Sequence, residues 1–150
     1  MESYRERVWP AVWVPVVIAL AIPASMLVLA PVNLTAGVIT GIVITAALVG
    51  VAIGTAPVID VSHGMLRAGA ARIPVTLLGT PISARAEEAR HERGPGLDAR
   101  AHLVLRGDVD GVVRVPINDP SDPVPYWLIS TRRPERLVAA ITAATTVAKK

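Results

Sequence analysis

The sequence predicts an α+β membrane protein, in which a two-helix transmembrane hairpin is followed by a small antiparallel β domain with a C-terminal helix. Three observations predict this class. Residues 8–59 contain no Asp, Glu, Lys, Arg or His. Short runs of alternating apolar residues, separated by turn residues, follow that stretch. After Pro134 the hydrophobic period changes from that of a strand to that of a helix.

The uncharged stretch, 52 residues from Val8 to Ile59, is long enough for two membrane spans. About 20 apolar residues cross a hydrocarbon core about 30 Å thick. Pro31 and Asn33 are turn residues near its middle, so we expect spans over about residues 9–30 and 34–56. Two buried soluble helices fit poorly because a soluble helix has a polar face. A cleaved signal peptide fits poorly too, because its apolar region is only about 7–15 residues long.

Prolines and glycines suggest how the two spans bend and pack. Pro10 suits a first turn, whereas Pro15 and Pro23 each remove a backbone hydrogen bond and are expected to bend the first span. Two pairs of glycines in the second span have the spacing that allows helices to approach closely. These helix-packing candidates are Gly37, Gly41, Gly50 and Gly54. The two pairs lie on different faces, so one could pack on the first span and the other on a second copy or a partner. Alternatively, glycine is simply common in membrane helices.

Arginines predict the orientation of the hairpin. Basic residues occur on both flanks of the uncharged stretch and not in its central turn: Arg5, Arg7, Arg67 and Arg72. Short basic flanks stay on the cytoplasmic side. We therefore expect a multi-pass protein of the cell (inner or plasma) membrane with both termini in the cytoplasm. Its expected parts are a cytoplasmic tail (residues 1–8), the hairpin (9–57) and a cytoplasmic β domain (58–150).

About seven short antiparallel strands are predicted after the hairpin. Ser62-His63-Gly64 has the composition of a hairpin turn between two β-prone runs. Pro74 is expected at a sheet edge because proline has no N–H to donate. The predicted strands are residues 58–61, 65–68, 72–75, 77–84, 101–106, 112–117 and 126–131, with a solvated helical turn or loop at 86–93. In the fifth of these strands, Ala101, Leu103 and Leu105 are predicted to share one face, and in the sixth, Val113, Val115 and Ile117 are predicted to point inward.

A C-terminal helix is predicted over residues 134–148. Pro134 suits its first position and Glu135 complements the helix dipole, as Lys149 and Lys150 do at the other end. Its apolar stripe consists of Leu137, Val138, Ile141 and Ala144. Short antiparallel strands closed by one amphipathic helix match the pleckstrin-homology-like architecture, a match of pattern that does not define a function.

Two motifs resemble those of a known family. The first is Tyr4-Arg5-Glu6-Arg7-Val8-Trp9-Pro10, before the predicted hairpin. The second runs from Asn118 to Glu135 and contains Pro125-Tyr126-Trp127-Leu128-Ile129-Ser130-Thr131-Arg132-Arg133-Pro134. Over nearly its whole length the chain resembles the actinobacterial membrane proteins catalogued as domain of unknown function 3093. The resemblance implies a small membrane protein and brings no assigned activity, so no catalytic residue follows from it.

Few side chains in the sequence have the spacing of a catalytic or metal site. Without cysteine, no disulfide or thiolate ligand can form. Asp108-x-Asp110-Gly111 resembles half of a cation loop but lacks the other ligands, so a turn is the better interpretation. Asp119 and Asp122 lie in a proline-rich loop, and the histidines, His63, His91 and His102, are widely spaced. We therefore expect no metal and no cofactor. An enzyme would have to use Asp108, Asp110, Asp119 or His102.

Aromatic and basic side chains near residue 130 predict a binding surface instead. Interfaces are rich in aromatic residues and arginine. The candidates are Tyr126, Trp127, Arg132, Arg133 and Arg136. The alternative is that the aromatic residues are core and the arginines only flank the helix. A formal charge of +3 is too small to indicate a nucleic-acid binder.

The sequence thus favours a membrane-anchored binding or scaffold module without enzymatic activity. The expected partners are membrane lipid and either a protein or a second copy of the chain, with no nucleic acid. The alternatives are an accessory subunit assembled through the second span and, less favoured, an enzyme.

Overall fold

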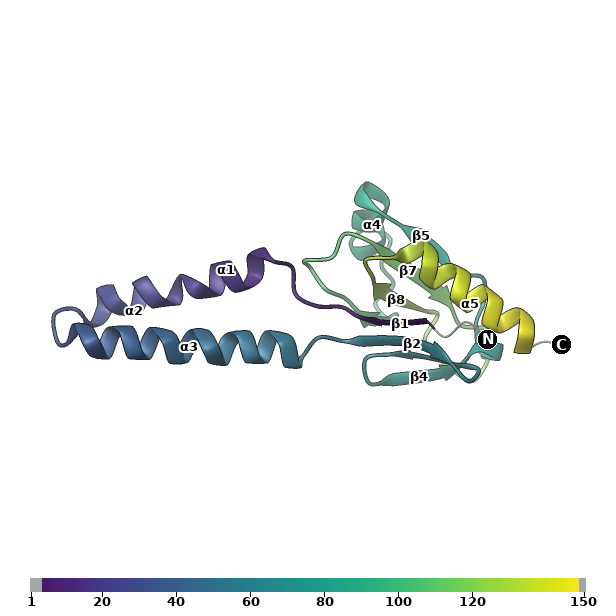
Figure 1. Ribbon diagram of the computed structural model, residues 1–150. Helices are drawn as coiled ribbons and strands as arrows, with labels where there is room; N and C mark the ends of the chain where they lie inside the picture. Colours follow the sequence, from purple (N-terminus) through teal and green to yellow (C-terminus); the bar gives the residue numbers. More distant parts are fainter. Residues whose placement is uncertain (1–3, 149–150) are drawn as a thin grey trace. The chain divides into compact units, whose positions relative to one another are not determined.

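The computed structural model describes residues 4–148 and divides into two compact units (Figure 1). One is a helical unit, Trp9–Ala56, and the other is an α+β unit formed by the residues on either side of it. The predicted mixed α+β class, with strands mostly antiparallel and a C-terminal helix, is confirmed. Lys149 and Lys150, predicted to complement the last helix, lie outside the described residues.

The helical unit is built from α1 (Trp13–Ala19), α2 (Ala21–Leu29) and α3 (Leu34–Gly54). The predicted turn separates α2 from α3, and the Asn33 side chain caps α3 by accepting a hydrogen bond from the Ala36 amide at 3.1 Å. Among the described helices, α3 is long and apolar enough to cross a membrane by length and composition. The residues of α1 and α2, Trp13–Leu29, form a shorter apolar segment.

The first predicted span is broken at Leu20 rather than continuous. Pro23 has no N–H for the Ala19 carbonyl, so the helical hydrogen-bond ladder cannot continue through that position. The interruption therefore lies in the turn before Pro23, the residue where a bend was expected. Pro15 instead lies in the first turn of α1, where its missing N–H costs little, and Pro10 precedes α1 altogether, contrary to the prediction for both residues.

The first sheet of the α+β unit has the strand order β1-β2-β3-β4, all antiparallel. Its strands are β1 (Tyr4–Arg7), β2 (Val58–Ser62), β3 (Met65–Ala68) and β4 (Ala71–Pro74). The predicted hairpin is confirmed, since His63 and Gly64 have φ values of 51° and 72°, as a two-residue type I′ turn requires. Pro74 lies on the edge strand, as expected. Within the predicted tail, residues 1–8, the segment Tyr4–Arg7 is a strand of this sheet and pairs with β2.

The second sheet has the order β5-β7-β8-β6. Its strands are β5 (Ile82–Ala84), β6 (His102–Val104), β7 (Val112–Pro116) and β8 (Tyr126–Ser130). Three predictions are corrected here. β6 pairs with β8 in parallel, and Leu103, expected to share one face with Ala101 and Leu105, is 44% exposed whereas those two residues pack against a core cluster. Only the end of the expected strand 77–84 is a strand: Leu77 ends a 3-10 turn, and Leu78 makes a single bridge to Ile117.

Helix α5 (Pro134–Ala148) covers a core formed by residues of both sheets, and α4 (Ala86–Arg93) follows β5. Leu137 and Ile141 are fully buried in that core, and Val138 and Ala144 pack against it, as the predicted stripe requires. Burying two such side chains contributes about 3–6 kcal/mol before the entropy of ordering is counted. Helix α5 is thereby fixed against both sheets.

Candidate functional site

The carboxylate of Glu6 is the centre of a hydrogen-bond cluster inside the α+β unit. Its Oε2 accepts hydrogen bonds from the Tyr4 hydroxyl and the Thr131 hydroxyl, each at 2.5 Å. Its Oε1 accepts one from the backbone amide of Arg132 at 3.1 Å. We call Tyr4, Glu6, Thr131 and Arg132 the Glu6 cluster. It joins β1 to the segment that leads into α5, and so brings the two motifs noted in the sequence into direct contact.

Local backbone geometry brings Thr131 to this position. Its amide donates to the Gly111 carbonyl at 3.0 Å, and its hydroxyl accepts from the Arg133 amide at 3.1 Å. A Cβ on Gly111 would lie 2.7 Å from the Thr131 carbonyl oxygen, so only glycine allows this approach. Thr131 is fully buried. A hydroxyl that is hydrogen-bonded to a carboxylate can act as a nucleophile in other proteins. A substrate has no access to the buried Thr131 hydroxyl. The Glu6 cluster therefore has a structural role, which is to connect β1 with the start of α5.

Burial, and after it the hydrogen bond to Glu6, raises the pKa of Tyr4 from 10.0 to about 12. A raised pKa means that the neutral phenol stabilises the fold below pH 10, and that this contribution is lost as the pH approaches about 12. We expect an alkaline ultraviolet titration of tyrosinate to contain a late component that Tyr4→Phe removes. If Tyr4→Phe instead removed a component that titrates near the ordinary value of 10.0, Tyr4 would not be held in this cluster.

The predicted aromatic and arginine surface is divided by the fold. Tyr126 and Trp127 are 3% and 6% exposed and belong to the core, so the interface hypothesis is wrong for these two residues. The Tyr126 hydroxyl accepts from the Asp98 amide at 2.7 Å, and the Trp127 ring contacts His102. The remaining candidates, Arg132, Arg133 and Arg136, are exposed at the start of α5.

An ion pair also holds the start of α5. Arg85, just after β5, donates two hydrogen bonds to the Glu135 carboxylate at 2.7 and 2.8 Å. The hydrogen bonds from Arg85 lower the pKa of Glu135 to about 2. The sequence indicates that Glu135 complements the helix dipole, but it does not indicate a role for Arg85 or Glu6. Arg85 is 50 residues from Glu135, and Glu6 is 125 residues from Thr131.

The carboxylates considered for metal or catalytic roles make hydrogen bonds or ion pairs with residues close to them in the sequence. Asp108 pairs with Arg106 at 3.0 Å, and Asp119 accepts from the Ser121 amide and hydroxyl. Asp122 accepts from the Val124 amide. Within residues 4–148 no group of three His, Cys, Asp or Glu side chains is placed to hold a metal ion.

The four glycines of α3 have two different environments. A Cβ would lie 3.0 Å from the Met26 Cα at Gly37 and 2.7 Å from the Ile22 Cα at Gly41, so α2 passes directly over both residues. At Gly50 and Gly54 an added Cβ would meet nothing within 4 Å. The first pair therefore packs the hairpin, while the second pair lies on an open face.

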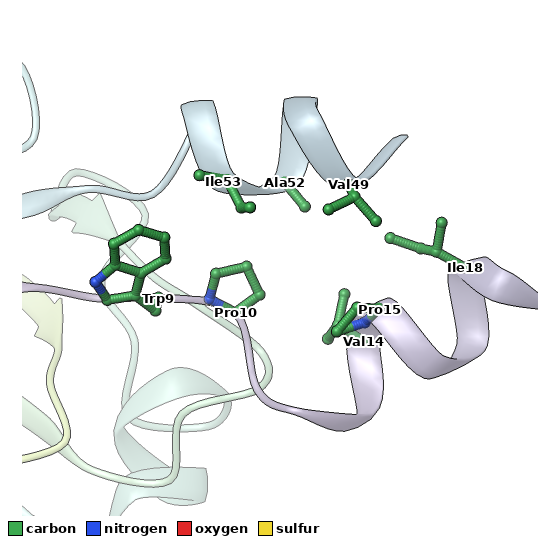
Figure 2. Close-up of a pocket in the computed structure, with 8 residues that line it drawn as sticks. All are labelled: Trp9, Pro10, Val14, Pro15, Ile18, Val49, Ala52 and Ile53. Atoms are coloured by element: carbon green, nitrogen blue, oxygen red, sulfur yellow. The ribbon is translucent and has the colours of Figure 1, made fainter. Parts of the chain in front are cut away.

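An apolar crevice lies between the two arms of the helical unit, where α1 diverges from α3 (Figure 2). It has a volume of about 150 Å³ and is lined by Trp9, Pro10, Val14, Pro15, Ile18, Val49, Ala52 and Ile53. The side chains that line it offer no titratable or nucleophilic group. The composition of the crevice therefore suits the binding of an apolar chain rather than a catalytic reaction.

These features define a class of protein in which an uncharged helical unit is inserted between the first strand and the rest of an α+β unit. The chain belongs to the family described as Protein of unknown function (DUF3093), whose model matches residues 3–141. Searches of the curated proteins and of the solved structures found no match to the chain.

Proposed function

We propose that this protein is a membrane-anchored binding module without enzymatic activity. One observation carries the proposal: the helical unit has no charged residue and leaves large apolar side chains in contact with solvent. Val12, Leu27, Val28 and Val32 are 75–85% exposed. Exposed apolar surface of this extent is expected where lipid is the solvent. A bilayer would cover it if α3 and the α1–α2 arm both cross, with the two termini on the cytoplasmic side.

The exposed arginines at the start of α5 support a binding role. Arg132, Arg133 and Arg136 stand where the helix dipole disfavours positive charge, an arrangement that an anionic partner would relieve. Their backbone is held by the Glu6 cluster and by the buried Pro134, so the surface is rigid before a partner binds. A pleckstrin-homology-like domain remains our proposal for the architecture, supported by the two sheets and the closing helix and weakened by the parallel β6–β8 pair.

Labelling of single introduced cysteines tests the anchor, because the chain has none of its own. Ser121→Cys lies in an exposed loop of the α+β unit, and Val32→Cys lies in the turn between α2 and α3. We expect a membrane-impermeant thiol reagent to label Val32→Cys in intact cells and Ser121→Cys only after the membrane is permeabilised. Equal labelling of both in intact cells, or recovery of the protein in the soluble fraction, would contradict a two-span anchor.

A second candidate function is an accessory subunit of a larger membrane complex. The open face at Gly50 and Gly54 favours it, because small residues on a membrane helix allow another helix to approach closely. This candidate requires that a larger side chain at Gly50 prevents assembly while the hairpin stays intact.

A further inference from the structure

The outer face of the first sheet is strongly basic. Side chains alternate along each strand, so one face of the sheet points to the core: Tyr4, Glu6, Ile59, Val61, Leu66, Ala68 and Ile73. On the opposite face, the strand register places Arg5, Asp60, Arg67 and Arg72 in one row across all four strands. Arg7 lies on the same face of β1. We call these five residues the arginine face.

The arginine face carries a large local excess of positive charge. Its four arginines and one aspartate give a formal charge of +3, which equals the formal net charge of the whole protein. The formal charges of all other residues therefore sum to zero. Arg5, Arg7, Arg67 and Arg72 are all exposed.

Folding alone does not explain the arginine face. Arg67 and Arg72 are directly opposite each other on neighbouring strands, and like charges in that position destabilise a sheet. Arg67 donates to the Gly69 carbonyl at 3.1 Å, a contact that leaves its charge uncompensated. None of the ion pairs within residues 4–148 joins Arg5, Arg67 or Arg72 to a carboxylate, although Asp60 stands between Arg5 and Arg67. An anionic partner would turn this unfavourable arrangement into a favourable one.

We propose that the arginine face binds anionic phospholipid headgroups of the membrane that holds the chain. The inference rests on the membrane anchor proposed above and adds a specific lipid class and a surface distinct from the start of α5. Arg7 is two residues before Trp9, and Val58 is four residues after Gly54. With at most about 3.6 Å per residue, these short connections keep β1 and β2 close to the ends of the helical unit. The surface of the bilayer is therefore always within reach of the arginine face. An acidic protein would first have to diffuse to that face.

A spin label on the arginine face tests the proposal with the full chain in lipid nanodiscs. Met65→Cys is exposed and lies on the same face as Arg67, two residues along β3, and the label is unique because the protein has no cysteine. Leu103→Cys, exposed on the other sheet, is the matched control. We expect anionic lipid to protect the Met65 label, and not the Leu103 label, from a water-soluble relaxation agent. High salt should abolish that protection because it screens the headgroup charge.

Charge variants measure the contribution of individual residues. Each basic residue near an anionic surface changes the ratio between molecules whose arginine face is bound to lipid and molecules whose arginine face is not bound by about fivefold. Arg67→Gln should therefore lower this ratio by about fivefold, and Asp60→Asn should raise it. A Met65 label that responds equally to zwitterionic and anionic nanodiscs, or does not respond to these variants, would overturn the proposal and favour an acidic protein. A chain that does not copurify with nanodiscs of either kind would instead overturn the membrane anchor itself.

Discussion

Glu6→Ala is expected to destabilise the α+β unit by about 3 kcal/mol, a large fraction of the stability of a small domain. The Glu6 carboxylate accepts three hydrogen bonds, and one of the donors, the Thr131 hydroxyl, is fully buried. Removing the acceptor leaves the buried Thr131 hydroxyl without its carboxylate partner, which costs more than the loss of the bond itself. Urea unfolding of the full chain in detergent micelles, followed by the circular dichroism of the strands, measures this loss.

Two further variants separate the hydrogen bonds from the charge of Glu6. Glu6→Gln keeps the size of the side chain but loses its charge and half of its acceptor capacity, so it should be intermediate. Arg5→Ala is the matched control, because it lies on the same strand with its side chain on the exposed face. It should change the free energy of unfolding by less than about 0.5 kcal/mol. If Glu6→Ala and Arg5→Ala unfolded at the same urea concentration, β1 would not be tied to Thr131.

Elements with local signals could be predicted from the sequence. The β2–β3 hairpin follows from two alternating runs around His63-Gly64, where both residues adopt positive φ. Helix α5 follows from Pro134 at its start and an apolar stripe at helical spacing. In each case the pattern and the partner lie within a few residues of each other, so sequence spacing is enough.

Strand β1 shows why other elements could not be predicted. Tyr4-Arg5-Glu6-Arg7 reads as a charged tail because its inward-facing residues are a tyrosine and a glutamate rather than aliphatic residues. They are half-buried and find their hydrogen-bond partners in the Thr131 hydroxyl and the Arg132 amide, which come from the far end of the chain. The parallel pairing of β6 with β8 was missed for a related reason: parallel partners are not joined by a short turn, so no local signal marks them.

The candidate site was predicted in part. Arg132, Arg133 and Arg136 are exposed where the sequence placed them. Tyr126 and Trp127 were assigned to a surface because aromatic residues beside arginines are typical of interfaces, but all five residues of β8 are buried. β8 lies between β7 and β6, so neither of its edges is open, and this position in the sheet could not be read from a single strand.

Gly41→Val is expected to separate α2 from α3 and weaken the hairpin by about 1–3 kcal/mol. An added Cβ would lie 2.7 Å from the Ile22 Cα and 2.8 Å from the Ser25 hydroxyl. The first of these atoms belongs to the backbone of α2, so the two helices must move apart rather than rearrange a side chain. The distance between spin labels at Val28→Cys on α2 and Ile39→Cys on α3, both exposed positions, should increase in nanodiscs.

Gly50→Val is the matched control on the same helix, because it makes the same change of side chain where an added Cβ meets nothing within 4 Å. It should leave the distance between the labels unchanged, which excludes a general effect of valine on α3. Its effect on assembly then distinguishes the two candidate functions. If Gly50→Val abolishes co-purification with other membrane proteins or with a second copy, the open face of α3 is an interface, and the accessory-subunit function is favoured. If assembly is unchanged, the glycines of α3 act only within the hairpin through Gly37 and Gly41, and binding is left to the arginines of the α+β unit.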